Sequence, residues 1–135
     1  MQAIHSNSAP AAIGPYAQAI RSGDLIFTSG QIALTADGTF IEDSVAAQTK
    51  QVMHNLEHVL QAAGCQLGCI VKTTIFLIDM NDFAAVNAVY SEALGDHRPA
   101  RATVAVAGLP RGARVEIECI ASATHCAGEG SPPCC

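Results

Sequence analysis

The order of the elements expected along this chain of 135 residues predicts an α+β domain, with a mixed sheet of about six strands and two helices on one face. β-forming segments lie near both ends, at 25–28 and 115–121. Segments with apolar residues at helical spacing lie between them, at 44–63 and 81–94. A third β-forming segment, 69–79, separates the two helices. Its second half is apolar on both faces, as in a strand near the centre of a sheet.

The N-terminal part predicts a turn followed by a pair of strands. Residues 9–20 begin as a turn and run into a strand that Tyr16 opens. The chain reverses at 22–24, and the returning strand 25–28 ends at Ser29. From the local pattern alone, Tyr16 is a half-buried aromatic residue and Ser29 is a turn residue at the strand end.

The first helix is expected over 44–63, because Asp43 or Ser44 can cap its start and a glycine follows its end. Its apolar residues fall on one arc, which consists of Val52, Met53, Leu56, Val59, Leu60 and Ala63. His54 and His58 form the HxxEH pattern of one class of zinc peptidases. At about 100° per residue they point away from that arc, so we interpret them as residues of a solvated face rather than metal ligands.

The second helix is expected to begin after Asp79 or Asn81 and to end at Leu94, before a glycine. Its apolar stripe consists of Phe83, Val86, Tyr90 and Leu94. Asn87 lies on the same stripe, where a carboxamide needs hydrogen-bond partners because burying an unpaired polar group is costly. Asn87 is therefore either a buried structural amide or a group at the edge of a pocket.

Two further strands are expected near the C-terminus, over 102–107 and 115–121, joined into a hairpin by a turn with proline and glycine. One end of this hairpin carries Arg101. In the second strand one face consists of Val115, Ile117 and Cys119, and the other of Arg114, Glu116 and Glu118. Composition alone makes Arg101 a surface ion-pair residue, because exposed pairs are common and contribute little.

Composition and charge argue against two classes of partner. The chain has 7 basic and 12 acidic residues, a net charge of −5 and no basic run, which argues against nucleic-acid binding. No apolar run approaches the roughly 18 residues of a membrane span. The first residues lack the charged start and apolar run of a signal peptide, so we expect a cytoplasmic protein.

The composition after Ala121 sets the expected domain boundary, and three of the six cysteines lie beyond it. Residues 1–121 are expected to form one domain, and 122–135, which are small and rich in glycine and proline, a disordered tail. We interpret the cysteines as reduced thiols, with Cys65 and Cys69 packed in the core. Solvated, metal-binding and oxidised roles stay open for the tail cysteines, which are Cys126, Cys134 and Cys135.

Several blocks together resemble the Rid family of reactive intermediate deaminases, also called the YjgF family. They follow the family's order and spacing at 9–20, 25–32, 79–83, 100–104, 109–112 and 115–121. The resemblance implies a chorismate-mutase-like fold, a homotrimer, and ligand clefts between neighbouring subunits. It also implies hydrolysis of 2-imino acids and their enamines, such as 2-iminopropanoate and 2-iminobutanoate, to 2-keto acids and ammonia, without a metal or bound cofactor.

The same resemblance assigns the site residues. Arg101 matches the arginine that binds the substrate carboxylate, and its guanidinium fork suits that group. Glu116 matches the glutamate that orients water or relays protons, and Glu118 on the same strand face is the alternative. Thr103 stands where many members have cysteine, so a hydroxyl donor replaces a thiol. The other residues that match cleft-lining positions are Tyr16, Ser29 and Asn87.

Two other functions stay open on the sequence. A protein of the same fold could bind a small carboxylate ligand without turnover. A ribonuclease or translation inhibitor, an activity ascribed to some family members, fits this acidic chain less well. The sequence does not select the physiological substrate among imines and enamines.

Overall fold

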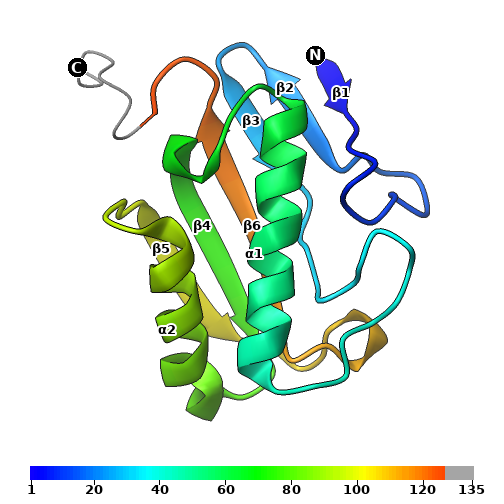
Figure 1. The fold of residues 1–135 in the computed structure, drawn as a ribbon, viewed down its shortest axis with the longest axis vertical. Helices are drawn as coiled ribbons and strands as arrows, with labels where there is room; N and C mark the ends of the chain where they lie inside the picture. The colour runs from blue at the N-terminus through cyan, green and yellow to red at the C-terminus, as the bar shows by residue number, and fades with distance from the viewer. Residues whose placement is uncertain (127–135) are drawn as a thin grey trace.

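The computed structural model describes residues 1–126 and confirms the α+β architecture, with six strands in one mixed sheet and both long helices on one face (Figure 1). The strands are β1 (Gln2–Ile4), β2 (Ala19–Ser22), β3 (Leu25–Thr28), β4 (Ile70–Leu77), β5 (Ala100–Ala105) and β6 (Val115–Ser122). The helices are α1 (Val45–Ala62) and α2 (Phe83–Leu94), with short 3₁₀ helices at Leu67–Cys69, Met80–Asp82 and Pro110–Gly112. The strand order is β1-β2-β3-β6-β4-β5, in which β4 and β5 run parallel and the other neighbours antiparallel.

The start of α1 and the ends of both helices follow the predicted residues, whereas α2 begins at Phe83 after Asp82, which forms no side-chain cap, rather than at a cap by Asp79 or Asn81. The Ser44 hydroxyl accepts a backbone N–H of the first turn of α1 at 3.1 Å, which satisfies one of the unpaired donors there. Gly64 and Gly95 follow the two helices with φ of +78° and +62°, a conformation that favours glycine. Asp79 caps the short 3₁₀ helix that leads into α2, with its carboxylate accepting from the Asn81 N–H at 2.9 Å.

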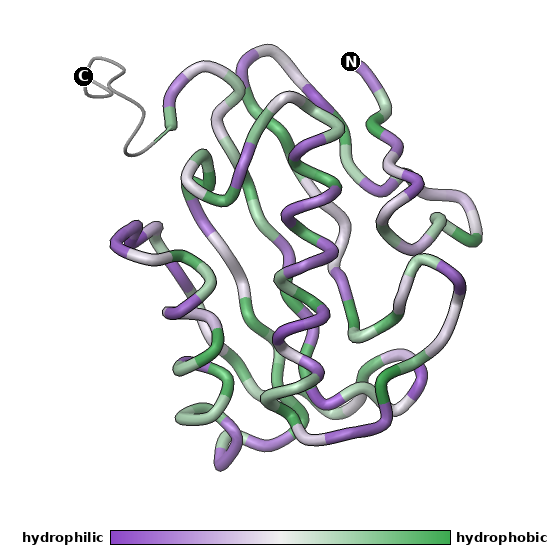
Figure 2. Tube along the Cα trace, in the orientation of Figure 1, coloured by the Kyte–Doolittle hydropathy of each residue, from purple (hydrophilic) through white to green (hydrophobic). Residues whose placement is uncertain are grey.

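The two faces of α1 are also as predicted. Val52, Leu56 and Leu60 are fully buried against the sheet, and Figure 2 shows hydrophilic and hydrophobic stretches alternating along this helix. His54 is exposed and its ring centroid lies 4.2 Å from that of half-buried His58. Within residues 1–126, no group of three or more histidine, cysteine or acidic side chains is placed to hold a metal ion.

The prediction that β5 and β6 form a hairpin is wrong, because β4 lies between these strands. Thr73 of β4 pairs with Arg101 on one side and with Cys119 on the other. The connection over 106–114 is long enough to cross the end of β4, and local alternation does not reveal which strand becomes a neighbour. The alternation within β6 is confirmed, since Val115, Ile117 and Cys119 are buried under the helices.

The N-terminal loop ends later than expected, because β2 begins at Ala19 and leaves Tyr16 outside the strand. The buried side chain of Gln18 holds this loop. Its Oε1 accepts from the Ser6 N–H at 2.6 Å, and its Nε2 donates to the carbonyls of Ser6 at 3.1 Å and Pro10 at 2.7 Å. Tyr16 is 56% exposed rather than half-buried. Strand β1, which the sequence pattern did not indicate, pairs with β2.

The sheet face opposite the helices is apolar and accessible. It carries Leu25 and Phe27 of β3, which are 39% and 42% exposed, and Val104 of β5, which is 42% exposed. Half-buried Phe76 and Ile120 lie on the same face, between those strands. Accessible apolar side chains on one sheet face suit a contact with another protein, and Lys72 and Glu118 lie among them on this face. No helix within residues 1–126 is long and apolar enough to span a bilayer.

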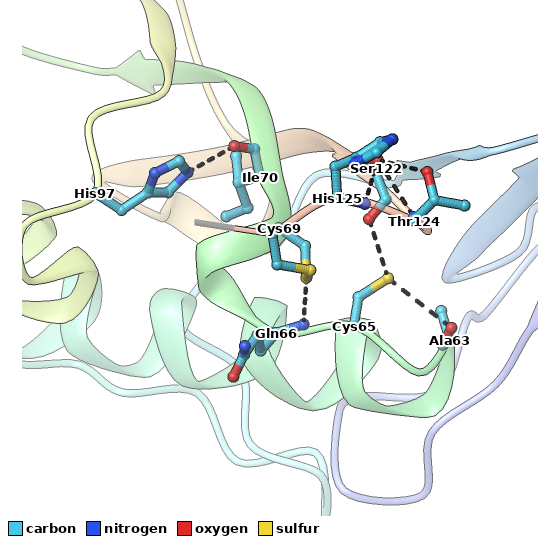
Figure 3. The surroundings of a disulfide bond; sticks show 10 residues. Ala63, Cys65, Gln66, Cys69, Ile70, His97, Ser122, Thr124 and His125 are labelled. Carbon is cyan, nitrogen blue, oxygen red and sulfur yellow. Dashed lines mark hydrogen bonds between the residues drawn. A yellow bond between two sulfur atoms is a disulfide. The ribbon is translucent and has the colours of Figure 1, made fainter. Parts of the chain in front are cut away.

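Cys69 and Cys126 form a disulfide, which corrects the expectation of reduced thiols at these two positions (Figure 3). β6 continues to Ser122, and the segment after it passes the start of β4, where Cys69 lies. The two cysteines are 57 residues apart, so no local spacing indicated the pair. Cys65 is buried as expected. The structure thus describes the first five residues of the expected tail, and 127–135, with the last two cysteines, lie outside the described residues.

Candidate active site

Arg101, on the edge strand β5, lies against α2. Its Nη1 donates to Asn87 Oδ1 at 2.6 Å, and its guanidinium carbon is 5.3 Å and 5.2 Å from the ring centroids of Phe83 and Tyr90. The Tyr90 hydroxyl is 2.7 Å from Thr73 Oγ1, which fixes that ring. One helix supplies all three contacts, because residues three and four apart share a helix face. Asn87 is therefore a half-buried amide that orients Arg101.

Arg101 is not the surface ion-pair residue that composition suggested. The ion pair found within residues 1–126 joins Arg114 to Asp82 at 2.9 Å, and Arg101 has no carboxylate within 4.0 Å. It lines a cavity of about 400 Å³ together with Asn87, Tyr90, Ser91, Arg98 and Pro99. The Arg101 guanidinium is held by two aromatic rings and one amide, and some of its N–H groups form no bond to these partners. Such a group suits a ligand carboxylate.

Thr103 follows Arg101 on the same face of β5. Thr103 pairs with buried Ile75, as Arg101 pairs with Thr73, so both side chains point to the helix side of the sheet edge. The Thr103 Oγ1 is buried and has no hydrogen-bond partner within residues 1–126. Buried hydroxyls are normally paired, so this one is suited to a ligand, a water or a second chain.

Glu116 lies in a second, separate cavity of about 130 Å³. Its carboxylate rests against the backbone of Gly30, where a Cβ would overlap Oε2 and lie 2.8 Å from Cδ. Tyr16 and Pro110 also line this cavity, at the accessible edge of the N-terminal loop. Ser29 precedes Gly30, and its hydroxyl donates to the Ala17 carbonyl at 2.6 Å, so it holds the loop that carries Tyr16.

The electrostatics of Glu116 suit proton transfer. Burial raises the pKa of its carboxyl above the ordinary value of 4.5, and the negative charge of Glu118 raises it further. A carboxyl with a raised pKa can hold and release a proton nearer neutral pH. Glu118 is exposed and does not line the cavity, so the geometry favours Glu116 over Glu118.

Arg101 and Glu116 face opposite sides of the same sheet. Arg101 pairs with Thr73, which is buried under the helices, whereas Glu116 pairs with Phe76 on the accessible face. Residues an odd number apart along a strand point to opposite faces, as Thr73 and Phe76 do. One chain therefore presents Arg101 and Glu116 in different places, which we call the two half-sites.

Sequence reasoning missed four contributors to these half-sites. Phe83 and Tyr90 were expected to be buried stripe residues only, and their spacing around Asn87 on one helix face was the available signal. Gly30 carried no signal, because its contact with Glu116 joins segments distant in sequence. Arg98 lines the Arg101 cavity, and nothing in the local pattern distinguished it from a surface arginine.

An arginine with free N–H donors and a glutamate with a raised pKa are groups that suit the binding and proton transfer of a small organic acid. The family model described as Endoribonuclease L-PSP matches residues 6–123, and the chain belongs to this family, the Rid or YjgF family.

Relatives and solved structures agree with this membership. This chain is 44% identical to Reactive Intermediate Deaminase A, chloroplastic, of Arabidopsis thaliana over 122 residues. The match covers 90% of this chain and 65% of that relative's length. Over 119 residues, 87% of this chain, it is 48% identical to 2-iminobutanoate/2-iminopropanoate deaminase of Mus musculus, and spans 88% of it. The crystal structure of E. coli TdcF with bound serine is 39% identical, with a TM-score of 0.86 over 90% of this chain and 98% of TdcF.

Proposed function

We propose that this protein hydrolyses 2-imino acids and their enamine tautomers, such as 2-iminopropanoate and 2-iminobutanoate, to 2-keto acids and ammonia. The observation that carries the proposal is Arg101, which is fixed by Asn87 and two aromatic rings beside a cavity and has no acidic partner within residues 1–126. The mouse relative is named for this reaction, and the TdcF structure contains an amino acid, which has the same carboxylate group.

The residues divide the reaction between binding and proton transfer. Arg101 binds the substrate carboxylate through two parallel charge-assisted hydrogen bonds and fixes the adjacent C=N bond. A water adds to the carbon of that bond, and Glu116 takes a proton from this water and passes it to the imine nitrogen, which gives a neutral carbinolamine. Glu116 then takes the proton of the carbinolamine hydroxyl and passes it to the amino group, so that the C–N bond breaks and ammonia leaves as the C=O bond forms.

A second copy of the chain completes the site in this proposal. Arg101 and Glu116 of one chain point to opposite faces, so a single subunit cannot present both to one substrate. A neighbouring copy that covers the apolar face around Phe27 and Val104 would bring its Glu116 to the Arg101 cavity. Such a head-to-tail contact closes into a ring, and we propose the homotrimer that the family resemblance implies.

The test is a coupled assay in which an amino-acid oxidase generates the imino acid from alanine or leucine. Semicarbazide traps the remaining imine, and the trapped product is followed by absorbance. Wild type should lower the signal and Arg101→Ala should not, whereas Arg21→Ala, which removes an arginine that bonds the Gly23 carbonyl outside both cavities, should behave as wild type. A wild-type protein without effect on any imine would contradict the proposal.

Ligand binding without turnover is the second candidate, favoured by the serine bound in TdcF. A binder would gain thermal stability from small carboxylates and would release no ammonia. A ribonuclease has less support, because the chain has a net charge of −5 and its accessible sheet face carries Glu116 and Glu118 rather than a basic run.

A further inference from the structure

Arg98 is a second guanidinium in the cavity of Arg101. It lies two residues before β5, and its Nη1 donates to the carbonyls of Gly95 at 2.6 Å and His97 at 2.8 Å. These two bonds use both hydrogens of Nη1 and hold the side chain at the end of α2. The Nε and Nη2 donors of Arg98 have no partner within residues 1–126.

The charge of this cavity is entirely positive. Its lining contains both arginines and no acidic side chain, although Glu92 and Asp96 are close in sequence. Neither acid forms an ion pair with Arg98 within 4.0 Å. Burial raises the pKa of Tyr90, and the charges of Arg101 and Arg98 act against that rise, which is consistent with both guanidinium groups lying near this phenol.

Two fixed cations in one cavity exceed what a monocarboxylate needs. Its volume of about 400 Å³ falls within the roughly 300–1,000 Å³ of small-molecule sites. A ligand with one carboxylate neutralises Arg101 and leaves Arg98 without an anionic partner from its own chain, whereas a ligand with two carboxylates can bond both. Ser91, which also lines the cavity, offers a neutral hydroxyl donor to the same ligand.

We infer that the cavity selects dicarboxylic ligands, with Arg101 binding the carboxylate beside the reacting carbon and Arg98 binding the distal one. This inference rests on the proposed function and specifies its substrate class as the 2-imino acids formed from aspartate or glutamate. Arg98 is thus a specificity-determining residue. A charge-assisted hydrogen bond lost from such a site changes an equilibrium by roughly 10- to 100-fold, which sets the size of the expected preference.

The test compares two measurements in wild type, Arg98→Gln and Arg21→Gln, the last as a matched control outside the cavity. The first measurement is the ratio of kcat/KM for the imine from aspartate to that for the imine from alanine. The second is the calorimetric affinity for succinate against butyrate, two stable acids of equal carbon number. Arg98→Gln should lower both ratios about tenfold or more, through KM in the first, and Arg21→Gln should leave both unchanged.

The outcomes separate the inference from the proposed function. Wild-type turnover with a ratio that Arg98→Gln does not lower would overturn the inference and leave the deaminase proposal standing. Absence of turnover with succinate binding that depends on Arg98 would overturn the deaminase proposal and leave the two-arginine cavity standing. Equal binding of succinate and butyrate by wild type, or binding of neither, would overturn the inference.

Discussion

At the scale of single residues, Gly30 and Glu116 depend on each other. Glu116 stands on β6 and points to the accessible sheet face, where its carboxylate occupies the space that a side chain at position 30 would fill. Gly30 has no positive φ, so contact with Glu116 rather than backbone strain excludes larger residues here. Small displacements of a catalytic group are costly, because reacting atoms must meet at defined distances.

Gly30→Ala should therefore lower kcat/KM about 100-fold by displacing the Glu116 carboxylate, while thermal unfolding shows a folded protein. Gly108→Ala is the matched control, since a Cβ there meets nothing within 4 Å and the backbone conformation is ordinary. Equal activity of the two variants in the semicarbazide assay would show that the position of Glu116 does not matter.

Glu116→Gln should lower the rate by roughly 10²- to 10⁴-fold, the usual contribution of a general acid–base, without loss of stability at pH 7. A carboxyl with a higher pKa in the folded protein takes up a proton on folding between the two pKa values. The free-energy cost of burying the Glu116 charge is therefore present when the pH is above the pKa in the folded protein. It is absent when the pH is below the ordinary pKa of 4.5. Urea unfolding at pH 7 and pH 4 should show the variant at least as stable as wild type at pH 7, with any advantage absent at pH 4. A variant less stable at pH 7 would contradict this.

At the scale of elements, the disulfide joins the end of β6 to the start of β4. Cys69 precedes β4 directly, and Cys126 follows β6 by four residues, so the bond fixes the C-terminal segment to the start of β4. A crosslink that closes a loop of this length restricts the unfolded chain, and the gain rises with loop length.

Cys126→Ser should lower the free energy of unfolding by about 2–4 kcal/mol, given the 57-residue separation of the bonded cysteines. Urea denaturation of oxidised protein, with and without dithiothreitol, measures this difference. The reductant should bring wild type to the stability of the variant and leave the variant unchanged. Coincident curves for all samples would mean that the bond does not contribute.

Elements with local signals were predictable, and those fixed by distant contacts were not. Ser44, Gly64 and Gly95 act through their own helix ends, so capping rules placed both helices. The position of β6 between β3 and β4 depends on which strands pair, and alternation leaves this undetermined. The Cys69–Cys126 bond likewise joins residues that only the folded sheet brings together.

The same distinction applies to the site. The family resemblance indicated Arg101, Asn87 and Glu116, and the structure gives Arg101 and Asn87 a direct hydrogen bond. The family resemblance did not indicate that Arg101 and Glu116 point to opposite faces, because the direction of each side chain follows from the strand register. Tyr16 lies beside Glu116 as a cavity-lining residue. The roles of Ser29 and Thr103 toward a substrate stay predictions.

At the scale of the whole molecule, one contact with a second copy would both cover the apolar sheet face and bring the two half-sites together. The face that carries Glu116 also carries Phe27 and Val104, so a partner that buries this apolar surface also approaches the proton-transfer group. Arg101 and its cavity lie on the other face of the sheet, at the edge strand β5 and against α2. A neighbouring copy can therefore complete the site at the same contact that covers the apolar face.

Subunit mixing tests this central claim most directly. Arg101→Ala and Glu116→Gln chains, each inactive alone, are unfolded together in urea at equal concentration, refolded, and assayed for imine hydrolysis beside wild type treated identically. Sites shared between neighbouring copies predict recovery of about one quarter of the wild-type activity, because that fraction combines an intact arginine with an intact glutamate. Activity no greater than the sum of the two variants refolded separately, with wild type fully recovered, would contradict a site completed by a second chain.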